Sequence, residues 1–448
     1  MSENTLAIVI LAAGKGTRMK SQQPKVLHKV AGRAMIEHVV ATATALSPKR
    51  MLAVLAPGMD RVAEAVAPMP TVVQEPQLGT GHAVRMAREA LTDFTGDVLV
   101  LYADNPLIRP RTLERMIAAR REAKGTAPAA VVLGFQPEDA GEYGRLIVDA
   151  AGELEAIVEF RDANPEQRRL GLCNSGVMLI DGAVLFALLD EIGNDNAKGE
   201  YYLTDIVAAA RARGLHCAVV EAAADEVLGV NSRAELAAAE AVCQSRLRAR
   251  FMADGVTLID PGSVFFSFDT QLGRDVVIEP HVFFGPGVEV GDNVTLRAFS
   301  HIEGAYIGDR ATIGPFARLR PGADIGEAAR VGNFVEIKNA CIETGAKVNH
   351  LTYIGDAHIG ARANIGAGTI TCNYDGFTKA LTEIGADAFI GSNTALVAPV
   401  NVGRGAIVGA GSVISADVPA DALALTRAPQ TVKEGWAAKF RQRQRPKS

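Results

Sequence analysis

The sequence is poor in cysteine, in aromatic residues and in excess charge of either sign. Its five cysteines are odd in number, widely spaced and never arranged as CxxC, which fits neither a zinc site nor a disulfide framework. The 46 basic and 51 acidic residues give a net charge of −5, which argues against nucleic acid or an anionic membrane as the main partner. No apolar run reaches the roughly 18 residues of a membrane-spanning helix, and the N-terminus lacks the pattern of a signal peptide. We therefore expect a cytoplasmic protein without membrane insertion.

The chain of 448 residues is long enough for about two to three domains. In its first half, continuous apolar runs such as LAIVIL (6–11) and DVLVLY (97–102) alternate with amphipathic helical patterns. Apolar strands that alternate with helices are typical of a sheet covered on both faces. The first half is predicted to be an α/β domain with a doubly wound, mainly parallel, Rossmann-like sheet.

One Ala- and Arg-rich helical pattern, SRAELAAAEAVCQSRLRARFMAD from Ser232, separates the two halves. We expect a first domain over residues 1–230, a helical linker over 231–251 and a second domain over 252–448. The basic end of the chain, FRQRQRPKS, is interpreted as a solvated tail.

After the linker pattern, aliphatic or aromatic residues recur at every sixth position with occasional steps of five. One such run is Ile313, Leu319, Ile325, Val331 and Ile337, and Gly follows many of the repeated residues. A period of six fits neither a helix nor an ordinary strand pairing, but it suits the flat faces of a parallel β-helix. The second half is predicted to be all-β, a left-handed parallel β-helix of hexapeptide repeats, with residues 366–383 leaving one corner as a loop.

A glycine-rich turn, LAAGKGTRM over residues 11–19, follows the first predicted strand. Gly14 and Gly16 permit a tight turn and a close approach of backbone N–H groups to a phosphate. Arg18 and Lys25 supply positive charge suited to a polyphosphate. The spacing matches neither GxxxxGK[ST] nor GxGxxG, so the turn indicates a nucleotide site of another kind.

Asp104 comes just beyond the run DVLVLY, at the carboxyl end of a predicted strand, where open α/β sheets bind their ligands. A carboxylate at this place is a candidate Mg²⁺ ligand. The alternative is a turn or helix-capping residue before Pro106.

The turn LAAGKGTRM, followed by PKVLHKVAG, resembles the signature of the sugar-nucleotide pyrophosphorylases. The second half adds NFVE (333–336), HLTY (350–353) and CNYDG (372–376) within the hexapeptide repeats. With these motifs the chain, from Leu6 to Trp436, resembles the bacterial bifunctional N-acetylglucosamine-1-phosphate uridylyltransferase / glucosamine-1-phosphate N-acetyltransferases.

The resemblance implies two reactions in the synthesis of UDP-N-acetylglucosamine, a precursor of peptidoglycan and lipopolysaccharide. Glucosamine-1-phosphate is acetylated with acetyl-CoA, and N-acetylglucosamine-1-phosphate then receives uridylyl from UTP with release of pyrophosphate. Mg²⁺ is the implied cofactor and a homotrimer the implied assembly.

For uridylyl transfer, the resemblance implies catalytic roles for Arg18 and Lys25 at the phosphates, and Mg²⁺ ligation by Asp104 and Asn231. The family usually has Gly where this chain has Ala103, a change that affects only local backbone freedom. The implied substrate-binding residues are Leu11, Ala12, Ala13, Gly14, Lys25, Gln74, Gly79, Thr80, Tyr102, Ala103, Asp104, Gly144, Glu159, Asn174 and Asn231.

For acetyl transfer, the resemblance implies that His350 is the general base, in a corner beside Tyr353 and the Asn373–Tyr374 loop. Arg320 and Lys338 lie eighteen residues apart, which we interpret as three coils in register, stacked on one face as a phosphate site. The alternatives are a solvated basic ladder and, for each histidine of the repeats (His281, His301, His350 and His358), a solvated coil residue. Cys372 as an acyl-accepting nucleophile is a less favoured alternative. The implied sugar-phosphate residues are Arg320, Lys338, Tyr353 and Asn364, and the implied acetyl-CoA residues are Ala367, Asn373, Tyr374, Ser392, Ala410 and Arg427.

Two other functions fit parts of the sequence. The first is a single-activity pyrophosphorylase whose β-helix is structural or regulatory, and the second is a non-catalytic scaffold that binds sugar nucleotides. The joint presence of Arg320, Lys338, His350 and the Asn373–Tyr374 loop argues against the first, and Asp104 together with Asn231 argues against the second.

Overall fold

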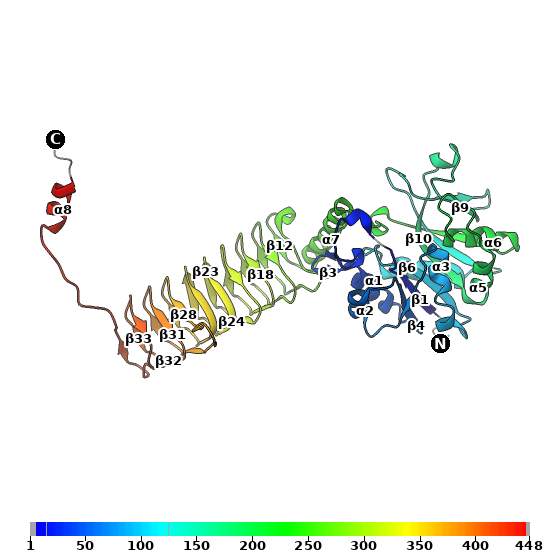
Figure 1. Cartoon of the computed structure of the whole chain (residues 1–448). Helices are drawn as coiled ribbons and strands as arrows, with labels where there is room; N and C mark the ends of the chain where they lie inside the picture. Colours follow the sequence, from blue (N-terminus) through cyan, green and yellow to red (C-terminus); the bar gives the residue numbers. More distant parts are fainter. Residues whose placement is uncertain (1–5, 15, 124, 445–448) are drawn as a thin grey trace. The chain divides into compact units, whose positions relative to one another are not determined.

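The computed structural model describes residues 6–14, 16–123 and 125–444, and the chain divides into two compact units, Met1–Arg246 and Leu247–Ser448 (Figure 1). The division falls inside helix α7 (Arg233–Ala253), in the stretch where the sequence predicts a helical linker.

The first unit is built on a sheet whose strands follow the order β11-β7-β10-β6-β1-β4-β5. All neighbours along this order are parallel except β10, which runs antiparallel to both β6 and β7. A hairpin of β8 and β9 attaches to β10. The strands are β1 (Leu6–Leu11), β4 (Arg50–Leu55), β5 (Thr71–Val73), β6 (Asp97–Tyr102), β7 (Ala130–Phe135), β8 (Arg145–Val148), β9 (Leu154–Val158), β10 (Cys173–Asp181) and β11 (Cys217–Ala222), with a separate pair β2 (Lys29–Val30) and β3 (Arg33–Ala34). The predicted mainly parallel sheet is confirmed, with one antiparallel strand in its centre.

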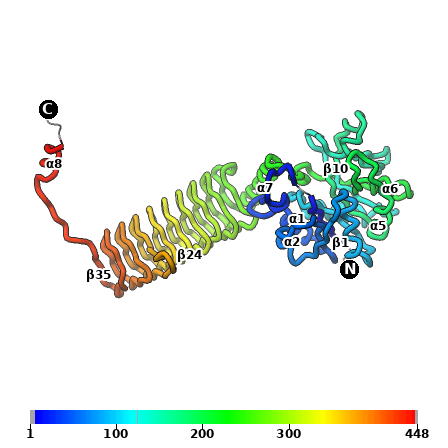
Figure 2. The backbone as a smooth tube through the Cα atoms, in the orientation of Figure 1, coloured from blue at the N-terminus to red at the C-terminus, as the bar shows by residue number. Residues whose placement is uncertain are grey.

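Helices cover both faces of this sheet (Figure 2). One apolar core joins Val9 and Val100 to residues of α3, α5 and α6, and the other joins Ile8 and Leu101 to residues of α1, α2 and α4. Strand β1 is buried along its whole length because both of its faces are covered. The helices are α1 (Met35–Ala45), α2 (Asp60–Val66), α3 (Thr80–Arg85), α4 (Pro110–Arg121), α5 (Gly182–Glu191) and α6 (Ile206–Ala212).

The second unit is a parallel β-helix of short strands, each stacked on the equivalent strand of the next coil (Figure 1). Its core consists of the residues of the six-residue repeat, such as Ile313, Leu319 and Ile337, which are fully buried. The prediction of a β-helix of hexapeptide repeats is confirmed. Helix α8 (Trp436–Gln444) follows the last coil and has no buried residue.

The strands of the β-helix form three faces. The first face contains β12 (Thr257–Leu258), β14 (Val277–Ile278), β17 (Thr295–Leu296), β20 (Thr312–Ile313), β23 (Arg330–Asn333), β25 (Lys347–His350), β27 (Asn364–Ile365), β30 (Phe389–Ile390), β33 (Ile407–Val408) and β35 (Leu423–Ala424). The second face contains β15 (Phe283–Phe284), β18 (His301–Ile302), β21 (Arg318–Leu319), β28 (Ile370–Cys372), β31 (Ala395–Val397) and β34 (Val413–Ile414). The third face contains β13 (Gln271–Leu272), β16 (Glu289–Val290), β19 (Ala305–Ile307), β22 (Ala323–Ile325), β29 (Thr382–Ile384) and β32 (Val400–Val402). Strands β24 (Glu336–Ile342) and β26 (Tyr353–Ile359) bend from the second face into the third.

We call the corner between the first and second faces the first edge, and the corner between the second and third faces the second edge. A column of rings follows the first edge: His281, Phe299, Phe316 and Phe334 stack with centroids 4.9, 4.9 and 5.1 Å apart. Each of these residues turns the chain with a positive φ, and the three phenylalanines are 45–55% exposed. The first edge therefore carries a continuous apolar strip on the surface of one chain.

His358 on the third face links three successive coils. Its Nε2 lies 2.9 Å from Glu343 Oε1 and its Nδ1 lies 3.0 Å from Glu383 Oε2. Burial opposes the charge on the imidazole, but the hydrogen bonds to the two carboxylates outweigh it and raise the pKa of His358 above 6.5. His358 is a partly exposed residue of the coil, as the sequence suggested, and its two carboxylate partners also link neighbouring coils.

His358→Gln should destabilise the β-helix at about pH 6 and have little effect at about pH 9. A histidine whose pKa is raised by folding contributes stability that is complete below its unfolded pKa and is lost as the pH rises through its folded pKa. Scanning calorimetry of the full chain at both pH values would measure this. His281→Gln, which removes a stacked ring without carboxylate partners, is the control, and a His358→Gln effect that is equal at both pH values would contradict the prediction.

Candidate active sites

A hollow of about 390 Å³ opens at the carboxyl ends of β1 and β6 in the first unit. It brings together ten residues that the sequence assigned to the nucleotide: Leu11, Ala12, Ala13, Gly14, Lys25, Gln74, Gly79, Thr80, Tyr102 and Asp104. Gln77 also lines it and was missed, although it follows Gln74 closely. The Gln77 amide donates to the Ala13 carbonyl oxygen, which fixes the glycine-rich turn.

The loop opposite the glycine-rich turn is held closely in place. Gln74 Nε2 donates to the carbonyl oxygen of Gly79 over 2.8 Å. Gly79 has φ +104°, and a Cβ there would lie 2.6 Å from the carbonyl oxygen of Tyr201. Only glycine fits this position, so the loop can present Thr80 at the start of α3 to the hollow.

Lys25, in the 3-10 helix η2 (Lys25–Leu27), joins the two residues that the sequence assigned to a metal. Its Nζ lies 2.5 Å from Asp104 Oδ2 and 2.9 Å from Asn231 Oδ1. The backbone also ties these segments together, since Val230 N donates to the Asp104 carbonyl oxygen. Two oxygens thus converge on one cation, and this hard donor set suits Mg²⁺. Within the described residues there is no cluster of three or more His, Cys, Asp or Glu that could hold a metal.

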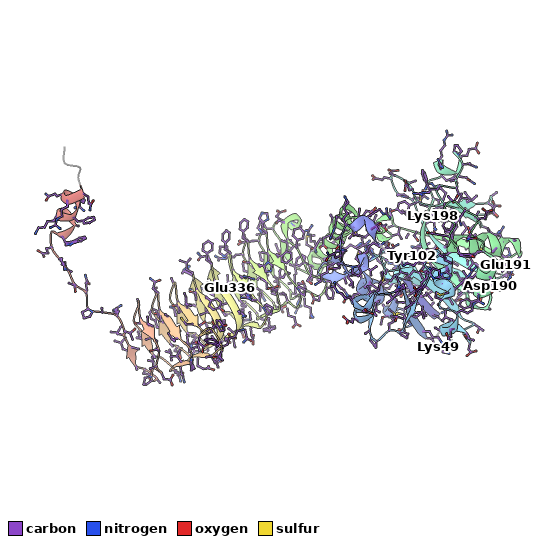
Figure 3. The ribbon with its side chains drawn as sticks, viewed as in Figure 1. Lys49, Tyr102, Asp190, Glu191, Lys198 and Glu336 are labelled. Atoms are coloured by element: carbon purple, nitrogen blue, oxygen red, sulfur yellow. The ribbon has the colours of Figure 1, made fainter. Side chains whose placement is uncertain are left out.

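A second hollow of the first unit, of about 330 Å³, is lined by Arg18, Glu159, Lys198 and Tyr202 among others. Figure 3 labels Lys198 and Tyr102 among the side chains of this unit. Burial raises the pKa of Glu159, and the Lys198 charge opposes that rise. Lys198 and Tyr202 were not predicted as site residues, because nothing in their spacing marks them.

The residues predicted to hold the sugar lie beside this hollow. A Cβ on Gly144 would lie 3.6 Å from Glu159 Oε1 and 3.7 Å from the Cβ of Asn174, so the three positions are neighbours. Ala103 is buried against β1, and its backbone N–H donates to the Leu11 carbonyl oxygen. Its methyl group is accommodated without a positive φ.

In the second unit, the first edge aligns His350 with three residues assigned to acetyl-CoA. Val348, Ile365, Ile390 and Val408 are successive partners on the first face, so the residues two places later form one column: His350, Ala367, Ser392 and Ala410. Arg427 joins this column, because its guanidinium donates to the Ala410 carbonyl oxygen over 2.8 Å. His350 Nδ1 lies 2.6 Å from Asn333 Oδ1 in the preceding coil.

Arg320 and Lys338 stack at the second edge on adjacent coils. Leu319 pairs with Ile337, so eighteen residues make one complete coil. The expectation of three coils between the two residues was wrong, because a coil consists of three hexapeptides. Arg320 also donates to Glu336, which Figure 3 labels on the second face, over 2.9 Å.

A third cation, Lys379, reaches the second edge from the loop that interrupts the repeats. The positive charge of Lys379 beside Lys338, ahead of slight desolvation and the charge of Arg320, lowers the pKa of Lys338. The same loop begins at Asn373, whose amide donates to Asp356. Lys379 was not predicted as a site residue, although a cation in a loop that breaks a strict repeat was the available signal.

The remaining acetyl-transfer residues lie on other parts of the chain surface. Tyr353 is on the second face beside Ile370, and Asn364 is on the first face beside Lys347. His350 is at the first edge, whereas Asn373 and Tyr374 leave the second edge. The expectation that His350 lies beside the Asn373–Tyr374 loop is therefore wrong within one chain, because a face of the β-helix separates the two edges.

Comparison with known proteins agrees with this division. The model of the MobA-like NTP transferase domain matches residues 8–170, and that of the bacterial transferase hexapeptide (six repeats) matches 269–304, 304–339 and 381–416. The "Bifunctional protein GlmU" of Paramagnetospirillum magneticum is 60% identical over 447 residues, covering 100% of this chain and 99% of the relative. Those of Rhodospirillum rubrum and Zymomonas mobilis are 66% and 53% identical and cover 97% and 98% of both chains.

The chain belongs to the GlmU family. Both units of this GlmU-family chain are thus transferase domains, and the prediction of a bifunctional uridylyltransferase and acetyltransferase is confirmed. The alternatives of a single-activity pyrophosphorylase and of a non-catalytic scaffold are set aside on the same ground. Among the described residues of the GlmU-family chain, no helix is long and apolar enough to span a membrane.

Lys379→Gln should raise the KM for glucosamine-1-phosphate by about tenfold, since a charge-assisted hydrogen bond to phosphate contributes roughly 1.5–3 kcal/mol. The kcat should change much less, because His350 is untouched. Steady-state acetyl transfer by the full chain would measure both constants. Arg274→Gln, several coils closer to the start of the β-helix, is the control, and an unchanged KM in Lys379→Gln would show that the loop cation does not hold the phosphate.

Proposed function

We propose that each unit carries out one step in the synthesis of UDP-N-acetylglucosamine. The second unit acetylates glucosamine-1-phosphate with acetyl-CoA, and the first joins the product to UTP and releases pyrophosphate. The observation that carries the proposal is the convergence of Asp104 and Asn231 on one cation in the same hollow as the nucleotide residues. The two activities correspond to domains over 1–230 and 252–448, joined by a helical linker over 231–251.

In uridylyl transfer, an oxygen of the sugar phosphate attacks the α-phosphorus of UTP and pyrophosphate leaves, so no protein nucleophile is needed. The backbone of residues 11–14, with Gln74, Gly79 and Thr80, holds the uridine part. Arg18 and Lys25 neutralise phosphate charge, and Gly144, Glu159 and Asn174 hold the sugar. Arg18 lines the hollow beside Glu159, whereas Lys25 lines the nucleotide hollow, which supports a phosphate path from one hollow to the other.

Asp104 and Asn231 would hold Mg²⁺, because their oxygens already converge on a cation. When bound, the metal supplies additional neutralisation of phosphate charge. One carboxylate and one amide leave several coordination positions for phosphate oxygens and water, as Mg²⁺ sites in phosphoryl-transfer enzymes commonly do.

In acetyl transfer, the substrate amine attacks the thioester carbonyl of acetyl-CoA and His350 accepts the proton of the amine. The side-chain amide oxygen Oδ1 of Asn333 can only accept a hydrogen bond, so it favours the neutral His350 tautomer with the proton on Nδ1 and the lone pair on Nε2. The CoA thiolate then leaves and takes up a proton. Arg320, Lys338 and Lys379 hold the sugar phosphate, and the column at the first edge holds acetyl-CoA.

The acetyl-transfer residues suit a homotrimer in which one rod's first edge meets a neighbour's second edge. Within one chain, His350 and the cations Arg320 and Lys338 lie on different edges, and Asn364 lies on the first face, away from those cations. The exposed ring column from His281 to Phe334 offers an apolar surface for such closure. Three-fold closure would complete three equivalent sites.

The substrates UTP and acetyl-CoA are cytoplasmic metabolites, and the cysteines of the described residues form no disulfide, which supports a cytoplasmic location. The direct test of the proposed function is one assay of purified protein with glucosamine-1-phosphate, acetyl-CoA, UTP and Mg²⁺, scored for thiol and for pyrophosphate. Release of both supports the two-step reaction, and release of only one would limit the enzyme to that step.

Asp104→Asn should lower uridylyl transfer by about two orders of magnitude or more and leave acetyl transfer unchanged. The amide keeps the shape of the side chain but removes the charge that a Mg²⁺ ligand supplies, which is worth several kcal/mol. Pyrophosphate release measures the first reaction and thiol release the second. Equal loss of both would indicate misfolding or a shared site instead.

His350→Ala should lower the kcat of acetyl transfer by roughly 10²- to 10⁴-fold, the usual contribution of a general base, and spare uridylyl transfer. Mixed assemblies of His350→Ala and Lys338→Gln chains add a test of the shared site. If His350 of one chain acts on phosphate held by another, co-refolded mixtures should recover activity that neither variant has alone. Thiol release by His350→Ala within about threefold of the unaltered enzyme would refute the catalytic assignment.

A further inference from the structure

Lys25 occupies an unusual position for a residue expected to face phosphate. Its ammonium is bonded to Asp104 and Asn231 at 2.5 and 2.9 Å, and the side chains of Lys25 and Asp104 are only 10% and 18% exposed. These are the two residues to which the proposed function assigns the metal. The protein's own cation therefore lies where the metal ligands converge.

The three residues come from separate segments whose backbones hold the arrangement together. Lys25 begins η2, Asp104 follows β6 and Asn231 precedes α7. The Val230 backbone N–H donates to Asp104, and the Asn231 backbone N–H donates to Glu235 over 2.7 Å. The backbones that carry Asp104 and Asn231 are thus held next to each other without Lys25, whose ammonium lies between their two side-chain oxygens.

A largely buried carboxylate is costly unless a cation balances it, so Lys25 stabilises the ligand-free site. An ammonium and a divalent metal need the same oxygens and repel each other, so both cannot bind there at hydrogen-bonding distance. Lys25 also lines the nucleotide hollow. Its flexible side chain could therefore turn from Asp104 and Asn231 toward the phosphates of a bound nucleotide.

We propose that Lys25 is a built-in counter-cation that competes with the divalent metal for Asp104 and Asn231. It neutralises the pair in the ligand-free enzyme and has to leave before a metal can bind. The proposal rests on the proposed function, because that assigns the metal to these two residues. Because of this competition, the protein without nucleotide should bind the metal more weakly than Asp104 and Asn231 would in the absence of Lys25.

The test is a titration of the full-length protein with Mn²⁺ in the absence of nucleotide, in which electron paramagnetic resonance counts the free ion. Lys25→Gln should bind Mn²⁺ roughly tenfold more tightly than the unaltered protein or more, because the competing charge is gone. Lys25→Arg keeps the charge and should bind no more tightly than the unaltered protein. Lys49→Gln removes an exposed lysine elsewhere in the first unit, labelled in Figure 3, and should change nothing.

Asp104→Asn separates the two ways in which the proposal can fail. If Asp104→Asn loses Mn²⁺ binding but Lys25→Gln binds no more tightly than the unaltered protein, the metal site stands and the competition is wrong. If Asp104→Asn binds Mn²⁺ as well as the unaltered protein, the assigned metal site is wrong and the competition falls with it. Tight binding by both Lys25→Gln and Lys25→Arg would mean that shape and not charge limits the metal, which also overturns the proposal.

Discussion

Each turn of the β-helix has to bury an aliphatic side chain on each of its faces, and this requirement fixes which residues of the second unit lie over one another. Leu319 pairs with Ile337, and Ile337 with Ile354. A slip of one residue would expose the aliphatic side chain and bury a polar neighbour, so the register is strongly specified. The outward residues consequently form columns, and the proposed acetyl-transfer residues lie in those columns. His350 and Ala410 share one edge, and Arg320 and Lys338 share another, because the core between them cannot shift.

In the first unit, the main constraint is the balance of charge at the end of a buried sheet. The central strands of this sheet are apolar, and polar side chains follow just beyond their ends. Asp104 therefore lies just beyond the carboxyl end of β6, partly shielded from water. Such a carboxylate needs a cation, and the chain provides one in Lys25. The neutralising groups that a polyphosphate requires are therefore present before any ligand binds. The same groups set the competition between Lys25 and a metal.

The two edges of the β-helix keep the proposed acetyl-transfer residues of one chain apart. From the sequence, His350 was expected beside Tyr353 and the Asn373–Tyr374 loop, because motif order carries no information about corners. In the structure the loop leaves the second edge and brings Lys379 to Lys338, away from His350. The separation follows from the three-sided coil, in which positions six residues apart face different directions. The carboxylate partners of His358 were not foreseen for a related reason, since Glu343 and Glu383 are 15 and 25 residues away.

The sequence by itself determined both architectures, because each rests on a local period that the eye can follow: apolar strands alternating with helices in one half, and a six-residue repeat in the other. It also determined the nucleotide hollow, since the glycine-rich turn and Asp104 follow strands whose ends must meet at one edge of a parallel sheet. Only the tertiary structure decided the features that depend on contacts between residues far apart in the sequence. The antiparallel course of β10, the bond between Lys25 and the Asp104–Asn231 pair, the arrival of Lys379 at the second edge and the assignment of His350 to the first are of this kind. Their residues are separated by tens to hundreds of positions, and no local pattern records which distant side chain a fold will place against them.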